Sequence, residues 1–171
     1  MSIMLDNIID NNAEQGLKDM HIVLVEPEIP GNAGNIARLC AATGCDLHLV
    51  KPLGFSTEDR YLKRAGLDYW HLVKVHYHNS LAEVLALYAG HSFHLSTTKG
   101  GRSYSDTSYG ADDLLIFGKE TAGLPESLLA AYRQHCVRLP MIDGARSLNL
   151  SNAVAVVVYE ALRQQNFPGL R

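Results

Sequence analysis

Cysteine is scarce in this chain of 171 residues, and long apolar runs are absent. The three cysteines, Cys40, Cys45 and Cys136, are too few and too unevenly spaced for a disulfide framework or a four-ligand zinc site. We expect reduced thiols with a structural role. No apolar run approaches the roughly 20 residues of a membrane span, and residues 1–19 lack the basic and apolar blocks of a secretion signal. The sequence therefore predicts a cytoplasmic protein without a membrane segment.

Several common catalytic motifs are also missing. The chain has no Gly-x-Ser-x-Gly elbow, no His-Glu-x-x-His motif, no evident pair of catalytic carboxylates, and neither a Walker A loop nor the dinucleotide fingerprint. The eight histidines are scattered, and neither His76 with His78 nor His91 with His94 has a third ligand nearby in the sequence. We therefore predict no metal site.

Net charge gives only weak information about the partner. The formal charge is −3, and four acidic residues against one lysine place all of it in the first nineteen residues. The remaining chain is neutral, so non-specific affinity for nucleic acid should be modest. We interpret residues 1–19 as a flexible N-terminal extension and residues 20–171 as one domain. RNA could still meet a local basic patch, for which the candidates are Lys99, Arg102, Arg138 and Arg146.

Short apolar runs alternate with helical patterns along the whole domain. This alternation predicts an α/β fold, a single domain with a largely parallel six-stranded sheet and helices on both faces. Helices are expected from residue 30 to Gly44, over 57–65, after the capping box Ser80–Glu83, over 125–135 and from 149 to about 165. The predicted strands are 21–26, 46–50, 72–77, 91–97, 114–117 and 136–139.

The last helix is the most apolar segment. Valines at 154 and 156–158 could also indicate a strand, but the flanks decide between the two. Asn149, Ser151 and Asn152 are N-cap residues, and Pro168 with Gly169 form a helix-stop signature. We predict a buried helix that begins at a polar loop.

Three polar loops should meet at one edge of the sheet. They cover residues 97–102, 118–124 and 141–149, and each follows a predicted strand. Ligands of parallel sheets bind at the carboxyl ends of the strands, and glycines in these loops let the backbone approach a ligand closely. The sequence predicts a binding site there.

Three segments, taken together, resemble the SPOUT superfamily of RNA methyltransferases. They are Asn32-x-Gly34-Asn35-x-x-Arg38, the run from Leu115 to Pro125 that contains Gly118-x-Glu120-x-x-Gly123, and Leu139-Pro140-Met141 with Ser147-Leu148-Asn149-x-Ser151. The segments 26–30, 64–69 and 97–100 look like the TrmL (YibK) branch of that superfamily, and the resemblance covers residues 20–169.

The resemblance implies more than the residues show by themselves. Members of the branch transfer a methyl group from S-adenosylmethionine to the 2′-hydroxyl of the wobble nucleotide, cytidine or uridine 34, of leucine tRNAs. It also implies a C-terminal trefoil knot, a rare exception to the rules of chain topology, and a homodimer whose active site is completed across the interface. Methylation of another tRNA or rRNA site, and a non-catalytic RNA-binding module, remain alternatives.

Residue roles also follow from the resemblance. The implied catalytic residues are Arg38, Ser147 and Tyr159, although Tyr159 could equally be a core aromatic residue. A guanidinium is a poor base, so we expect Arg38 to orient the hydroxyl and the phosphate, and we assign no general base. Phosphates would be held by Lys99 and Arg102, with Arg146 as a further candidate. The implied cofactor residues are Ser96, Gly118, Glu120, Leu139, Met141, Ser147, Leu148 and Asn149.

The chain departs from the branch at three places. Gly31 and Lys119 stand where proline is common, and the first nineteen residues have no counterpart. Lys119 could alter how the cofactor or the RNA is held.

Overall fold

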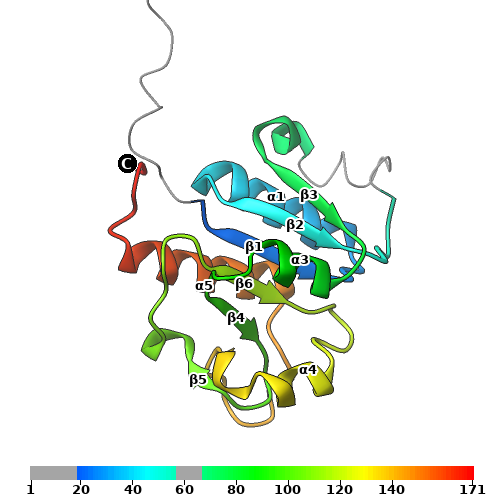
Figure 1. The fold of residues 1–171 in the computed structure, drawn as a ribbon, viewed down its shortest axis with the longest axis vertical. Helices are drawn as coiled ribbons and strands as arrows, with labels where there is room; N and C mark the ends of the chain where they lie inside the picture. The colour runs from blue at the N-terminus through cyan, green and yellow to red at the C-terminus, as the bar shows by residue number, and fades with distance from the viewer. Residues whose placement is uncertain (1–18, 57–66) are drawn as a thin grey trace, which may run out of the picture.

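The computed structural model describes residues 19–56 and 67–171, in which seven strands form one sheet (Figure 1). The strand order is β3-β2-β1-β6-β4-β7-β5, and every strand pair is parallel. The prediction of an α/β domain with a parallel sheet is confirmed. The strands are β1 (His21–Val25), β2 (Asp46–Val50), β3 (Val75–His78), β4 (Phe93–Ser96), β5 (Arg102–Ser103), β6 (Leu114–Phe117) and β7 (Cys136–Arg138).

The predicted count of six strands is wrong because β5 lies in a segment that we expected to be a loop. Its two residues pair with Val137 and Arg138 at the edge of the sheet. Gly101 makes this approach possible, since its φ is +93° and an added Cβ would lie 2.7 Å from the carbonyl oxygen of Cys136. A polar strand of two residues has no alternating pattern by which the sequence could reveal it.

Helices cover both faces of the sheet, as predicted. The α1 (Pro30–Thr43) and α5 (Leu150–Gln164) helices share one hydrophobic core with alternate residues of β1, such as Ile22 and Leu24. On the opposite face, α3 (Leu81–Leu87) and α4 (Glu126–Ala131) pack over Val23 and Val25. Figure 1 shows α3 in front of the sheet and α5 beside β6. The central strands β1, β2 and β6 therefore bury both of their sides, as expected for a parallel sheet.

The helix ends confirm the signals in the sequence. Asn149 caps α5, because its side-chain Oδ1 accepts hydrogen bonds from the backbone N–H groups of Ser151 (3.0 Å) and Asn152 (3.4 Å). Helix α1 ends at Gly44, whose φ of +77° is the left-handed conformation favoured at this position. Ser80 caps α3 as predicted, because its hydroxyl accepts the N–H of Glu83 at 3.2 Å, but the Glu83 carboxylate accepts from the N–H of Asn79 at 2.8 Å where the capping box would use that of Ser80.

Other boundaries differ from the predictions. The third strand begins later than expected, because Leu72 belongs to a 3-10 helix, η1 (Leu67–Leu72). The helix predicted over 125–135 is shorter and is followed by a 3-10 turn, η3 (Arg133–His135). A further 3-10 turn, η2 (Tyr104–Asp106), follows β5. The helix expected over 57–65 and nearly all of the N-terminal extension lie outside the described residues.

All three cysteines, Cys40, Cys45 and Cys136, are buried free thiols, which agrees with a structural role. In the described ranges, no helix has both the length and the apolarity that a bilayer crossing requires. The trefoil knot stays a prediction of the resemblance.

Three histidines from neighbouring strands form a hydrogen-bonded row beneath α3. His48 of β2 lies between His21 of β1 (Nδ1 to Nε2, 3.1 Å) and His78 of β3 (Nε2 to Nδ1, 2.9 Å). Nitrogen and oxygen atoms of His21, His48 and Asp46 come within 4.8 Å of one another, but both ring nitrogens of His48 are already hydrogen-bonded. The structure does not test the prediction that the protein has no metal site, and that prediction stands as made from the sequence. The sequence did not reveal this row because it arises from the register of parallel strands.

Burial makes this row sensitive to acid. His48 is fully buried, and its pKa is lowered to about 3 because burial penalises the charged ring and because the rings of His76, His21 and His78 add repulsion. The pKa values of His21 and His78 are lowered as well, mainly by burial. In the unfolded chain these rings take up protons below about pH 6.5. The folded state is therefore destabilised as the pH falls from that value toward the pKa of the folded state.

We predict that His48→Gln reduces the loss of stability in acid. The wild-type chain should lose about 2 to 3 kcal/mol through His48 between about pH 7 and about pH 4.5, because only the unfolded state gains that proton. Glutamine keeps a donor and an acceptor but does not titrate. Urea denaturation at both pH values measures the difference. The exposed His71 provides the control variant His71→Gln, and an equal acid loss in wild type and His48→Gln would contradict the role of this ring.

Candidate functional site

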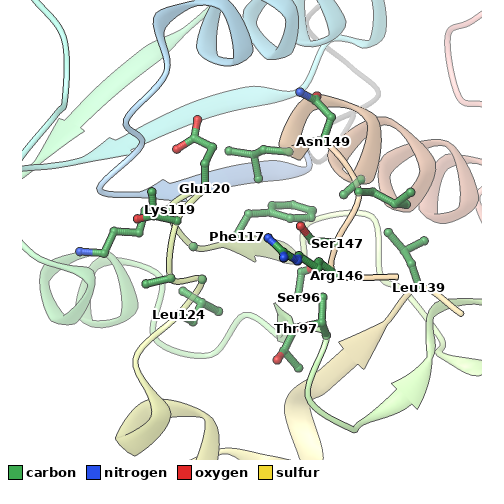
Figure 2. A pocket seen from close by; sticks show the side chains of 18 of the residues that line it. Ser96, Thr97, Phe117, Lys119, Glu120, Leu124, Leu139, Arg146, Ser147 and Asn149 are labelled. Atoms are coloured by element: carbon green, nitrogen blue, oxygen red, sulfur yellow. The ribbon is translucent and has the colours of Figure 1, made fainter. Parts of the chain in front are cut away.

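A cavity of about 870 Å³ opens at the carboxyl edge of the sheet, where the three predicted loops meet. It lies among the ends of β4, β6 and β7 and the start of α5, and Figure 2 shows the side chains that surround it. Apolar side chains such as Phe117, Leu124 and Leu139 contribute to the lining together with polar groups. Ten residues named from the sequence line this cavity: Ser96, Lys99, Gly118, Glu120, Leu139, Met141, Arg146, Ser147, Leu148 and Asn149.

Gly118 has a steric role in the loop after β6. A Cβ atom at this position would lie 2.1 Å from the carbonyl carbon of Gly123 and 2.2 Å from the backbone nitrogen of Leu124. The loop turns back on itself there, and the N–H of Gly123 donates to the carbonyl of Lys119 at 2.8 Å. The need for glycine thus comes first from the loop's own backbone, whereas the sequence had suggested the approach of a ligand.

Glu120 ties this loop to the start of α1. One carboxylate oxygen accepts the backbone N–H of Glu28 at 2.8 Å, and the other accepts the N–H of Ile29 at 3.1 Å and the side-chain amide of Asn32 at 3.0 Å. A carboxylate is well placed there, because the first N–H groups of a helix have no partner within the helix and carry partial positive charge. Glu120 lines the cavity, but both of its carboxylate oxygens accept hydrogen bonds from other residues of the protein.

Asn32 extends this connection to α5. Its side-chain oxygen accepts a hydrogen bond from the amide of Asn149 at 3.0 Å, while its own amide donates to Glu120. Asn32 is buried, with 5% of its surface exposed. The side chains of Glu120, Asn32 and Asn149 therefore hold the loop after β6, the start of α1 and the start of α5 in one arrangement.

Basic groups stand around the cavity. The Lys119 ammonium donates to Glu26 at 2.9 Å, and this carboxylate raises the pKa of Lys119. Lys99 forms an exposed ion pair with Glu126 at 3.0 Å. Figure 2 shows the Arg146 side chain beside Ser147 at the cavity. Exposed ion pairs contribute little stability, so Lys99 can exchange its carboxylate for a phosphate at small cost.

Three predicted residues lie outside the lining of the cavity. Arg102 lies in β5 and is exposed. Arg38 is exposed on α1, with its guanidinium 5.0 Å from the centre of the Tyr69 ring. Tyr159 of α5 is 47% exposed, so the alternative that it is a core aromatic residue is wrong. Within one chain, the structure therefore separates Arg38 and Tyr159 from the cofactor residues.

The sequence profile of the SpoU rRNA Methylase family matches residues 19–159. The chain belongs to this family. The three segments that carried the SPOUT resemblance lie within the matched range, and two of them form the loops around the cavity.

Several curated SpoU relatives are about half identical to this chain. The tRNA (cytidine(34)-2′-O)-methyltransferase of Methylovorus glucosotrophus is 52% identical over 149 residues, which are 86% of this chain and 97% of that protein. The protein of the same name from Escherichia coli K12 is 49% identical over 151 residues, covering 88% of this chain and 96% of that protein. The recognition of the branch is confirmed.

Solved structures agree with this SpoU assignment. A structure described as giving insights into 2-OH methylation of C/U34 on tRNA has a TM-score of 0.83 at 45% identity, covering 88% of this chain and 99% of that one. The SpoU methyltransferase AviRb of Streptomyces viridochromogenes, in complex with AdoMet, has a TM-score of 0.74 at 25% identity, covering 90% of this chain and 60% of that one.

Some lining residues were not identified from the sequence. Phe117 reads as an ordinary core position, because it is an apolar residue in a strand. Asn32 lies in a quoted motif, yet nothing in that motif shows that it contacts both Glu120 and Asn149. Only the folded chain brings these segments together.

We predict that Glu120→Gln destabilises the fold by about 1 to 3 kcal/mol. Glutamine replaces one acceptor oxygen with an NH₂ group that faces backbone N–H donors, so at least one charge-assisted hydrogen bond is lost. Urea denaturation measures the effect. Glu126→Gln is the matched control, because Glu126 is exposed and its described partner is Lys99 alone; it should change stability by less than about 0.5 kcal/mol. Similar values for the two variants would show that the Glu120 contacts carry little weight.

Proposed function

We propose that this SpoU-family protein transfers a methyl group from S-adenosylmethionine to the 2′-hydroxyl of nucleotide 34, a cytidine or a uridine, in leucine tRNAs, and that it acts as a homodimer in the cytoplasm. The observation that carries the proposal is the cavity formed by the family's own segments at the carboxyl edge of the sheet. The relatives named for cytidine 34 support the position on the tRNA.

The cavity suits an adenosine group. Leu139, Met141 and Leu148 supply apolar surface for the flat faces of a base, and the loops that carry Gly118 and Ser147 bring backbone groups for its polar edges. When bound, S-adenosylmethionine supplies an electrophilic methyl group on a sulfonium. The residues that would hold it are Ser96, Gly118, Glu120, Leu139, Met141, Ser147, Leu148 and Asn149, with Glu120 and Asn149 acting by keeping the loops in place.

The RNA would be held at the basic side of the cavity. Lys99 and Arg146 line the cavity, and Arg102 lies in the short edge strand β5. Phosphate contacts of this kind fix the orientation of a nucleic acid without reading its sequence. The choice of leucine tRNAs therefore rests on the resemblance to the branch.

An exposed apolar surface supports the homodimer. Val156 and Tyr159 lie one turn apart on α5 and are 39% and 47% exposed, and Ile29 beside the start of α1 is 48% exposed. Helices α1 and α5 pack against each other, so their outer sides form a neighbouring surface. A second copy of the chain would cover these side chains. It would also bring Arg38 of the partner subunit to a cavity that the chain's own Arg38 does not line.

The proposed chemistry is an in-line displacement that depends on alignment. Arg38 orients the ribose hydroxyl and the neighbouring phosphate through its N–H donors. Ser147, at the mouth of the cavity, places a hydroxyl close to the reacting ribose, and Tyr159 contributes from the dimer surface. No residue is assigned as the general base, since a guanidinium holds its proton too tightly.

The first prediction of this proposal is methyl transfer to the wobble position. Labelled S-adenosylmethionine and the purified protein should label bulk tRNA from a strain that lacks this activity. Nucleoside analysis and mapping should place a 2′-O-methylated pyrimidine at position 34 of leucine tRNA. Label at another site would redirect the proposal to a different substrate, and cofactor binding without label in tRNA would contradict it. Loss of cofactor binding as well would point to a non-catalytic module.

The second prediction tests completion of the site across the dimer. Arg38→Ala should abolish transfer and preserve cofactor binding, whereas Leu148→Asp should abolish cofactor binding, because Leu148 lines the cavity and tolerates a polar group at 44% exposure. A purified heterodimer of the two variants should recover roughly half of the wild-type rate, since one of its two sites then carries neither substitution.

The methyl-transfer rate of the heterodimer is compared with the rates of the two variant homodimers. Both homodimers should be inactive, and a heterodimer that is also inactive would show that Arg38 serves the cavity of its own chain. Arg133→Ala removes an exposed arginine next to α4 and provides the control for loss of positive charge.

A further inference from the structure

We propose that Tyr69 is a positioning residue for Arg38, holding the guanidinium through a cation–π contact that leaves its N–H donors free for the RNA. The inference rests on the proposed function, in which Arg38 orients the ribose hydroxyl and the phosphate. It adds a specific element of the fold, η1, to the machinery of the site.

The contact comes from two segments that are far apart in the sequence. Arg38 lies in the third turn of α1, and Tyr69 lies in η1, which packs along α1. The guanidinium carbon of Arg38 is 5.0 Å from the centre of the Tyr69 ring, within the roughly 6 Å over which a cation and an aromatic face attract each other. Tyr69 is 36% exposed, so one part of the pair packs against the protein and another faces solvent.

Arg38 has no competing partner among the residues that the structure describes. Its guanidinium forms neither a hydrogen bond nor an ion pair with any residue in the ranges 19–56 and 67–171. Arg163 is different, because two of its nitrogens donate to Glu160 at 2.8 and 2.9 Å. A carboxylate partner of that kind would use the donors and offset the charge that a phosphate needs. The face of an aromatic ring leaves the N–H donors unused and does not neutralise the positive charge.

The position of Arg38 on its helix explains why it needs a support. The neighbours Ile36, Ala37 and Cys40 are buried against the sheet, whereas Arg38 shares the exposed side of α1 with Asn35. A long side chain on an exposed helix face samples many rotamers. Tyr69 restricts these rotamers before the RNA binds, so less conformational freedom is lost when the reacting geometry forms.

This arrangement predicts a defect in turnover with normal cofactor binding. Tyr69→Leu removes the ring, and kcat on leucine tRNA should fall about tenfold, the loss expected for a cation–π contact of partial exposure. The Kd for S-adenosylmethionine should not change, because Tyr69 lies outside the lining of the cavity. Tyr69→Phe keeps an aromatic face and should restore most of the rate.

Tyr132→Leu is the matched control. Tyr132 has the same exposed fraction as Tyr69, 36%, and packs against Phe93 on the opposite side of the sheet. Its loss should leave kcat unchanged. Equal rates for Tyr69→Leu and wild type would overturn the proposal, and so would an equal loss in Tyr69→Leu and Tyr69→Phe, which would assign the effect to the hydroxyl group.

A second measurement separates this inference from the proposed function. The ring current of Tyr69 should shift the NMR signals of the Arg38 Cδ–H and Nε–H groups, and this shift should persist in Tyr69→Phe and vanish in Tyr69→Leu. If the wild-type protein methylates no tRNA, the proposed function fails while the NMR experiment still tests the contact. If the wild type is active and the Arg38 signals do not change in Tyr69→Leu, the positioning role fails alone.

Discussion

Asn32 joins the three parts of the chain that surround the cavity. Its amide donates to Glu120 after β6, and its side-chain oxygen accepts from Asn149 at the start of α5. The three side chains are separated by 88 and 117 residues along the sequence. A buried polar side chain of this kind is costly unless all of its groups are paired. The arrangement of the loops therefore depends on Asn32 meeting both partners at once, and the shape of the cavity depends on the loops.

The same network shows how helix ends are used in this fold. Glu120 accepts from the N–H groups of Glu28 and Ile29 just before α1, and Asn149 accepts from the first N–H groups of α5. Both helices begin at the carboxyl edge of the sheet, where the strand order also brings β1 next to β6. The N–H groups of Glu28 and Ile29 thus join the start of α1 to the loop after β6, and the Asn149 side chain joins the start of α5 to Asn32. Other groups that line the cavity are left to bind the cofactor that we propose.

The two faces of the sheet carry different constraints. One face is an apolar core between the strands and the helices α1 and α5. The other includes the row His21, His48 and His78, in which burial lowers the pKa of every ring. The row can exist because neutral imidazoles both donate and accept hydrogen bonds. It lies under α3, and none of its three residues lines the cavity, so it is an element of stability.

Sequence by itself determined the elements and the family. Apolar runs with turn residues between them predicted the parallel sheet, the caps at Asn149 and Gly44 marked helix ends, and three motifs identified the SPOUT resemblance, because these signals depend on neighbouring residues. Tertiary structure alone decided the partners of Glu120, the edge strand β5, the histidine row, and the separation of Arg38 from the cavity of its own chain. Each of these depends on strand register or on contacts between distant segments, which local patterns do not encode.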